Sequence, residues 1–142
     1  GAVDVVIDPT DSQIVYASLW NTRRPTWYTY QPTNGPGGGI YKSTNGGTTW
    51  APLTNGLPTE CVGRSGVAVA PSNPRRLYAV VDDFLPEGAP AGTPCPGTPS
   101  ARGSAAAPAP PTPQQGGFYR SDDAGATGSK VVPGDLLTDS RS

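Results

Sequence analysis

The residues best suited to chemistry form an aromatic and basic cluster near the N-terminus. Residues 20–30 read WNTRRPTWYTY, and the side chains suited to ligand contact are Trp20, Arg23, Arg24, Trp27, Tyr28 and Tyr30. Flat indole and phenol rings can stack on a sugar ring or a peptide, and guanidinium groups bind carboxylates and hydroxyls. The cluster therefore predicts a glycan or peptide site. In the alternative interpretation, the tryptophans pack onto the protein itself and the arginines pair with acids such as Asp8 or Asp11.

Carboxylates are the other candidates, because the chain contains no histidine. This absence excludes a Ser-His-Asp triad and every imidazole general base. Hydrolysis of a glycoside ordinarily needs two carboxylates about 5 to 9.5 Å apart. Asp4, expected on a strand, and the adjacent Asp82 and Asp83, expected at a strand end, are the acids considered for this role. Adjacent acids at a strand end are more often solvated turn residues, so the catalytic residues stay unknown.

The cysteine and charge patterns exclude several classes of ligand. The two cysteines, Cys61 and Cys95, lack metal-ligand spacing, so we expect no metal and no cofactor. They either form a disulfide that ties down a long insertion in an oxidising compartment or remain two free thiols. Ten basic and eleven acidic side chains give a net charge of −1 without a basic run. We therefore expect neither nucleic acid nor a membrane as partner.

An internal repeat predicts the elements that must position these residues. Residues 7–17, IDPTDSQIVYA, reappear in step as residues 69–79, VAPSNPRRLYA. Each copy predicts a strand, a turn opened by proline and a second strand. A further pair follows in the same order, with residues 38–50, GGIYKSTNGGTTW, matching residues 116–128, GGFYRSDDAGATG.

The repeat predicts an all-β fold. Each unit supplies about four short antiparallel strands, and such a sheet cannot bury its faces alone. Four-stranded units repeated along a chain are typical of β-propeller blades. We therefore interpret the chain as about two four-stranded antiparallel β-propeller blades from a larger propeller, with assembly from several copies as the alternative.

Part of each repeat resembles the Asp-box, or BNR repeat, whose pattern is Ser-x-Asp-x-Gly-x-Thr-Trp. The matching residues are Ser43, Asn45, Gly47, Thr49 and Trp50 in the first unit and Ser121, Asp123, Gly125 and Thr127 in the second. The resemblance is to bacterial sortilin-like and glycosyl-hydrolase-like secreted propellers, with sialidases and xyloglucan hydrolases as more distant users of the box.

This resemblance implies a structural role for the box on the rim of a propeller. The box forms a hairpin turn in which Asn45 or Asp123 accepts backbone N–H bonds, while Gly47 or Gly125 adopts a conformation closed to other residues. Trp50 is expected to pack beneath its turn and hold it against the blade.

The repeat also divides the chain. Residues 1–58 form the first blade unit with its Asp-box hairpin, and residues 59–83 with 116–130 form the second. Residues 84–115, rich in Pro, Ala and Gly, are expected to be a flexible insertion. Residues 131–142 are expected to be a poorly ordered C-terminal tail.

The expectation for the tail depends on Gly128, which stands where the box has Trp. Truncation of a core Trp costs about 3 to 5 kcal/mol, so the second hairpin is expected to lack its anchor. Order is then expected to end near Lys130.

The composition, with few lysines and abundant Thr, Ser, Gly and Pro, and the resemblance both favour a secreted or periplasmic bacterial protein. We expect an extracytoplasmic propeller module for carbohydrate or peptide binding or for scaffolding, with the remaining blades or other copies as partners. The alternative is part of a glycoside hydrolase acting on polysaccharide, although the chain shows no complete catalytic constellation.

Overall fold

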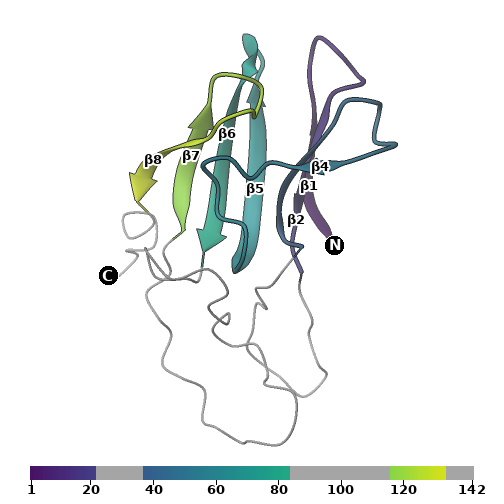
Figure 1. Ribbon diagram of the computed structural model, residues 1–142. Coiled ribbons are helices and arrows are strands. Elements are labelled where there is room, and N and C mark those ends of the chain that lie inside the picture. Colours follow the sequence, from purple (N-terminus) through teal and green to yellow (C-terminus); the bar gives the residue numbers. More distant parts are fainter. Residues whose placement is uncertain (22–36, 84–115, 134–142) are drawn as a thin grey trace, which may run out of the picture.

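Two four-stranded antiparallel sheets make up the fold (Figure 1). The computed structural model describes residues 1–21, 37–83 and 116–133. Its strands are β1 (Ala2–Ile7), β2 (Val15–Leu19), β3 (Gly39–Ser43), β4 (Ala51–Pro52), β5 (Val62–Ala70), β6 (Asn73–Asp83), β7 (Gly117–Ser121) and β8 (Ser129–Pro133). The predicted all-β class, with two four-stranded antiparallel sheets, is confirmed. In these ranges no helix is long and apolar enough to cross a membrane.

The repeat in the sequence is also a repeat in strand register. Each sheet runs in chain order, β1-β2-β3-β4 and β5-β6-β7-β8. Positions that match in the two sequence copies lie opposite each other in the same way in the two sheets. One such row runs through Val5, Ala17 and Tyr41 in the first sheet and through Val67, Ala79 and Tyr119 in the second.

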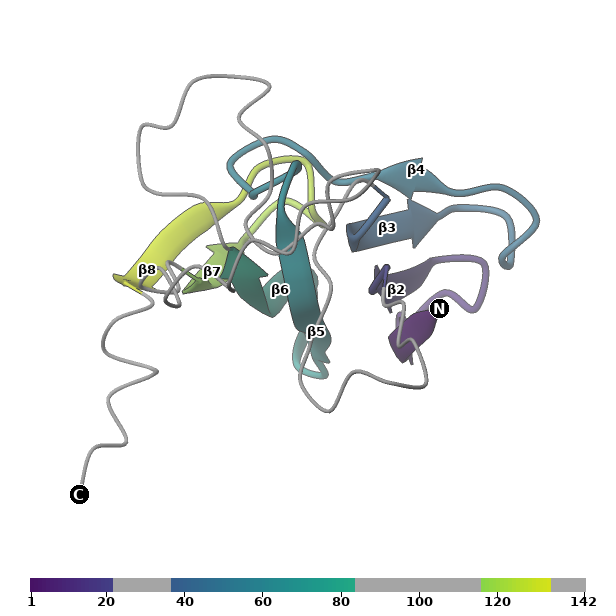
Figure 2. The same ribbon diagram turned by 90° about the horizontal axis from the view of Figure 1, so that it is seen from below.

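The two sheets pack so that β5 lies against the face of β1, β2 and β3 (Figure 2). Two polar contacts fix this arrangement. Ser18 is fully buried and its hydroxyl donates to the carbonyl oxygen of Ser65 at 2.5 Å. The amide N–H of Val67 donates to the carboxylate of Asp4 at 3.2 Å. Around them lies the buried core, made of Tyr16, Ile40, Val62, Val67, Leu77, Ala79, Val81 and Tyr119.

The segment between β4 and β5 crosses to the second sheet and locks the units together (Figure 2). Leu53 and Leu57 pack against the core. The amide of Gly128 donates to the carbonyl oxygen of Asn55 at 2.8 Å, and the Asn55 amide group donates to the carbonyl oxygen of Ala126 at 3.2 Å. Gly56, with φ +79°, lies so close to Gly128 that a Cβ atom there would overlap the Gly128 carbonyl oxygen.

The C-terminal boundary differs from the expectation. Strand β8 continues past Lys130 to Pro133, because Val132 lies opposite Phe118 and Pro133 lies opposite Gly117 in the ladder with β7. The second unit therefore extends beyond the predicted end of order. The predicted insertion, residues 84–115, and residues 134–142 lie outside the described residues.

The close approach at Gly56 gives a stability prediction. Gly56→Ala is expected to lower the free energy of unfolding by about 2 to 5 kcal/mol, because left-handed strain and overlap with Gly128 add together. Gly37→Ala is the matched control, since Gly37 has φ +89° but no neighbour within 4 Å of an added Cβ. It is expected to cost only the strain, about 1 to 2 kcal/mol. Urea denaturation followed by circular dichroism measures both, and equal losses would contradict the role given to this contact.

Candidate functional site

The first box hairpin is held by its own side chains. The hydroxyl oxygen of Ser43 accepts the amide N–H of Gly47 at 2.9 Å and donates its proton to Oδ1 of Asn45 at 2.9 Å. The same Oδ1 accepts the amide N–H of Thr49 at 2.8 Å. These bonds supply partners for backbone groups of a tight turn that has no ladder of its own.

The second hairpin repeats this network with an acid. Ser121 donates to Oδ1 of Asp123 at 2.7 Å, and the same Oδ1 accepts the amide N–H of Thr127 at 2.8 Å. In the first box the Asn45 amide donates to the Thr49 hydroxyl at 2.8 Å, whereas in the second the Thr127 hydroxyl donates to Asp123 at 2.6 Å. Because a hydroxyl can donate or accept, Asn and Asp fit the same position.

Each hairpin also bonds to the chain at the turn between the first two strands of its unit or just after it. The amide of Gly46 donates to the carbonyl oxygen of Gln13 at 2.9 Å, and the amide of Ala124 donates to that of Arg75 at 2.7 Å. Ala124 adopts φ 59°, the left-handed region that its counterpart Gly46 occupies at φ 66°. The first box is therefore bonded to the β1–β2 turn, at Gln13, and the second to the start of β6, at Arg75.

Trp50 and Gly128 differ from the sequence expectation in what they contact. Trp50 closes its own hairpin by donating its indole N–H to the carbonyl oxygen of Gly47 at 2.9 Å, but it stays 41% exposed. Gly128 does not leave a vacancy beneath the second hairpin. A Cβ there would lie 3.3 Å from Leu57 and 3.4 Å from the carbonyl oxygen of Asn55, so the first unit already fills this space.

A contact between the units at Ala124 was not visible in the sequence pattern. The carbonyl oxygen of Ala124 accepts the Lys42 ammonium at 2.8 Å and the Tyr16 hydroxyl at 3.2 Å. The Lys42 nitrogen lies 5.4 Å from the centre of the Tyr16 ring. Burial, and then the negative charge of Asp8, raises the pKa of Tyr16 to about 12. Two side chains of the first unit thus hold the box of the second.

The structure places only one member of the predicted aromatic and basic cluster. Trp20 follows β2, is partly exposed, and pairs through its backbone with Gly1: its amide donates to the Gly1 carbonyl oxygen at 2.9 Å, and the terminal amine donates to the Trp20 carbonyl oxygen at 2.7 Å. The other members, Arg23, Arg24, Trp27, Tyr28 and Tyr30, lie outside the described residues.

Asp8 and Asp11, the acids considered as partners for the arginines, cap their own turn. Asp8 accepts the amide and hydroxyl of Thr10, both at 2.7 Å, and Asp11 accepts the amide of Gln13 at 2.9 Å. The bonds from Thr10 lower the pKa of Asp8.

The acids considered for hydrolysis have distinct environments. Asp4 holds the amide of Val67, so its carboxylate contributes to packing of the sheets. Asp82, at the end of β6, is partly buried, and this burial raises its pKa while the positive charge of Arg64 opposes the rise. Asp83 follows it and ends the strand. Among the described residues no group of acids and cysteines could hold a metal ion.

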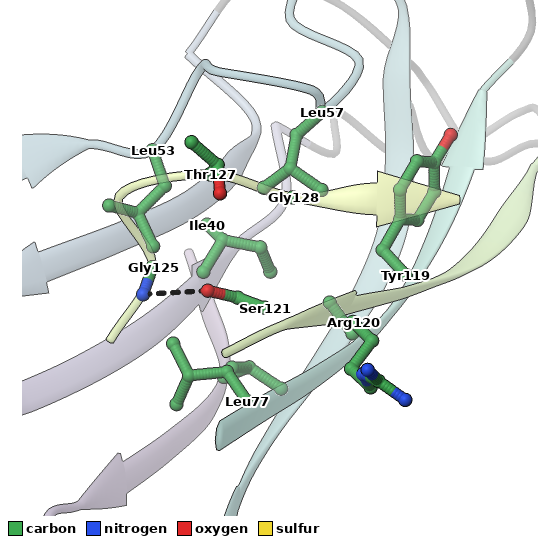
Figure 3. A pocket seen from close by; sticks show the side chains of 12 residues that line it. Ile40, Leu53, Leu57, Leu77, Tyr119, Arg120, Ser121, Gly125, Thr127 and Gly128 are labelled. Atoms are coloured by element: carbon green, nitrogen blue, oxygen red, sulfur yellow. Dashed lines mark hydrogen bonds between the residues drawn. The ribbon is translucent and has the colours of Figure 1, made fainter. Parts of the chain in front are cut away.

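The cavity between the units is a packing gap (Figure 3). Its volume is about 20 Å³, and Leu53, Leu57, Leu77 and Tyr119 are among the side chains that line it. A single water needs roughly 10 to 15 Å³, so this space holds about one water molecule and no sugar ring.

Cys61 is fully buried and disulfide-bonded. Cys95, the second of the chain's two cysteines, lies outside the described residues. The interpretation with two free thiols is therefore wrong.

Comparison of the chain with known proteins found no match among family models, curated proteins or solved structures. The Asp-box interpretation rests on the residues and bonds of the two hairpins.

The two boxes predict a specific response to acid. Hydrogen bonds from the Thr127 side chain and amide, and then from Ser121, lower the pKa of Asp123 from 3.8 to about 2. The stability that the ionised Asp123 contributes is complete above pH 3.8 and is lost as the pH falls toward 2. Asp123→Asn is expected to fold at neutral pH, because the first box has Asn45 at the equivalent position and forms the same hairpin. This variant is expected to lose less stability between pH 4 and 2 than the natural chain.

Asn45→Asp is the reciprocal control, because it gives the first box a carboxylate that titrates, and it is expected to increase the loss on acidification. Thermal unfolding followed by circular dichroism from pH 5 to 2 measures all three proteins. An unchanged acid response in Asp123→Asn would contradict the role given to this carboxylate.

Proposed function

We propose that the chain forms two successive blades of a β-propeller that serves as an extracytoplasmic binding or scaffolding module for a glycan or peptide. One observation carries the proposal. The second sheet buries a face against the first unit, and the first sheet exposes the equivalent positions along its outer strand, β1, while Val15 and Ala17 on β2 are 8% and 5% exposed. Val67 is 5% exposed, whereas Val5 at the matching position is 56% exposed. Repetition of one packing arrangement in a fixed direction is how blades stack around a propeller.

The ends of the strands support a ligand-binding face opposite the boxes. Both box hairpins and both docking turns lie at one end of the two sheets. The long connections, 20–38 and 84–116, leave and re-enter the sheets at the other end (Figure 1). Connections of this length inside a compact domain are usually either functional or linker segments. The aromatic cluster belongs to the first of them, and Asp82 and Asp83 end the strand, β6, that leads into the second.

Stacking on an aromatic ring gives the test of binding. In a screen of oligosaccharides and extended peptides by isothermal titration calorimetry, the natural chain is expected to bind at least one class. Trp27→Ala is expected to weaken that binding about tenfold, which corresponds to about 1.4 kcal/mol. Trp50→Ala is the matched control, because Trp50 is an exposed tryptophan at the opposite, box end of the sheet. Equal binding by the natural chain and Trp27→Ala would contradict the proposal.

Part of a glycoside hydrolase is a second candidate, favoured by Asp82. Burial raises the pKa of this carboxyl, as a general acid requires. If the candidate is correct, release of reducing sugar from a polysaccharide falls by at least a hundredfold in Asp82→Asn. Asp122→Asn is the control, because Asp122 pairs with Arg76 at 2.6 Å and Arg120 at 2.7 Å in the box region. Equal sugar release by Asp82→Asn and the natural chain would exclude this role.

A further inference from the structure

We infer that copies of this chain associate head to tail, with the exposed face of the first sheet in one copy packing against the exposed face of the second sheet in another. The inference rests on the blade stacking of the proposed function and is independent of its ligand. A second copy of this chain covers each of the two faces.

The leading face is the outer side of β1, the edge strand of the first sheet, and carries Val3, Val5 and Ile7. These side chains are 38%, 56% and 58% exposed. Their equivalents in the second sheet are Ser65, Val67 and Val69, on the face that packs against the first unit. Ser65 and Val67 are only 3% and 5% exposed. The exposed residues of the leading face therefore occupy the positions whose equivalents on β5 are buried or partly buried against the first unit.

The trailing face is the outer surface of the second sheet, formed around Tyr78, Val80 and Phe118. The rings of Tyr78 and Phe118 stack with centres 5.6 Å apart, and Val80 is 46% exposed. The equivalents of these residues in the first sheet are Tyr16, Ser18 and Ile40, which are 0%, 0% and 3% exposed because the second unit covers them. The residues of the trailing face are thus equivalent to the residues of the first sheet that lie in the interface between the two units.

The two faces are complementary because each repeats one half of a contact already made inside the chain. Across that contact, the face around Tyr16 and Ile40 meets the face around Val67 and Ala79. A trailing face in one copy can meet a leading face in the next in the same way. The contact joins different surfaces of the two copies, so it is heterologous and can be repeated until the assembly closes.

Exposed side chains at the rim extend this complementarity. In the internal contact, Leu53 approaches the second box so closely that a Cβ on Gly125 would lie 2.7 Å from it. Val131, the equivalent of Leu53, is 53% exposed, and Gly47 is the equivalent of Gly125. Val131 of one copy is thereby placed to approach Gly47 and the exposed Trp50 of the next. Exposed apolar side chains grouped on a face, here Val3, Val5 and Ile7, are typical of an interaction surface.

Charged substitutions on the two faces test the inference. Val5→Lys blocks the leading face and Val80→Lys blocks the trailing face, and both side chains are exposed in the single chain, so folding is expected to persist. Sedimentation velocity over a wide concentration range is expected to show the natural chain rising in mass from 14.5 kDa with concentration. Each variant alone is expected to remain at the mass of one chain.

An equimolar mixture of the two variants gives the sharpest result. Each variant keeps the face that its partner lacks, so the mixture is expected to form a one-to-one dimer of about twice 14.5 kDa and no larger species. Thr44→Lys, at an exposed hairpin position outside both faces, is the control and is expected to associate like the natural chain. Far-ultraviolet circular dichroism verifies the fold of each variant.

A natural chain that remains at 14.5 kDa at every concentration would overturn the inference, as would a mixture that forms no dimer. Association of Val80→Lys alone would also overturn it, because it would show that leading faces pair with each other. The calorimetric titration above is performed on the same chain, so a single-chain species that still binds a glycan or peptide overturns head-to-tail association and leaves ligand binding intact.

Discussion

Coverage of the apolar face of the second sheet is the constraint on which the rest of this structure depends. A four-stranded sheet that leaves one such face in water is marginal on its own. Here the face around Val67 and Ala79 is covered by Tyr16 and Ile40 from the first sheet and by the segment that carries Leu53. The segment can lie this close only because glycines stand at the contact on both sides, as the missing space for a Cβ at Gly56 shows.

The box hairpins contribute to this coverage through the hydrogen bonds of their backbone. A tight turn leaves amide groups without ladder partners, and the Ser and Asn or Asp side chains supply them. The hairpin then becomes rigid enough to present a free carbonyl oxygen, at Ala124, to Tyr16 and Lys42 of the first unit. The chemistry of the box is therefore directed inward, at the fold, and the proposed ligand-binding face lies at the opposite end of the strands.

Local pattern was sufficient to predict the strands and their order. The in-step repeat of residues 7–17 and 69–79 predicts two strands and a turn in each copy, and the structure has them at β1–β2 and β5–β6. The side chains singled out in the two hairpins bond within a few residues of each other, as their close spacing in the sequence predicts.

Contacts between the units could not be predicted in this way. Gly128 was interpreted as a lost anchor, whereas its small size admits Leu57 and Asn55 from the first unit. Trp50 was expected beneath its turn, and it is largely a surface residue bonded to Gly47. The end of β8 at Pro133 depends on pairing with β7. Each outcome depends on how the two sheets meet, which no short segment of sequence specifies.

Native-state hydrogen exchange tests most directly whether the two units unfold in a single cooperative step. The amides of Val67 and Gly128 bond across the units, to Asp4 and Asn55, whereas the amide of Ala124 bonds within the second unit, to Arg75. If the second sheet depends on the first for its stability, all three amides exchange with the same opening free energy, that of global unfolding. Rapid exchange at Val67 and Gly128 while Ala124 stays protected would show that the sheets separate and remain folded, and would contradict this account.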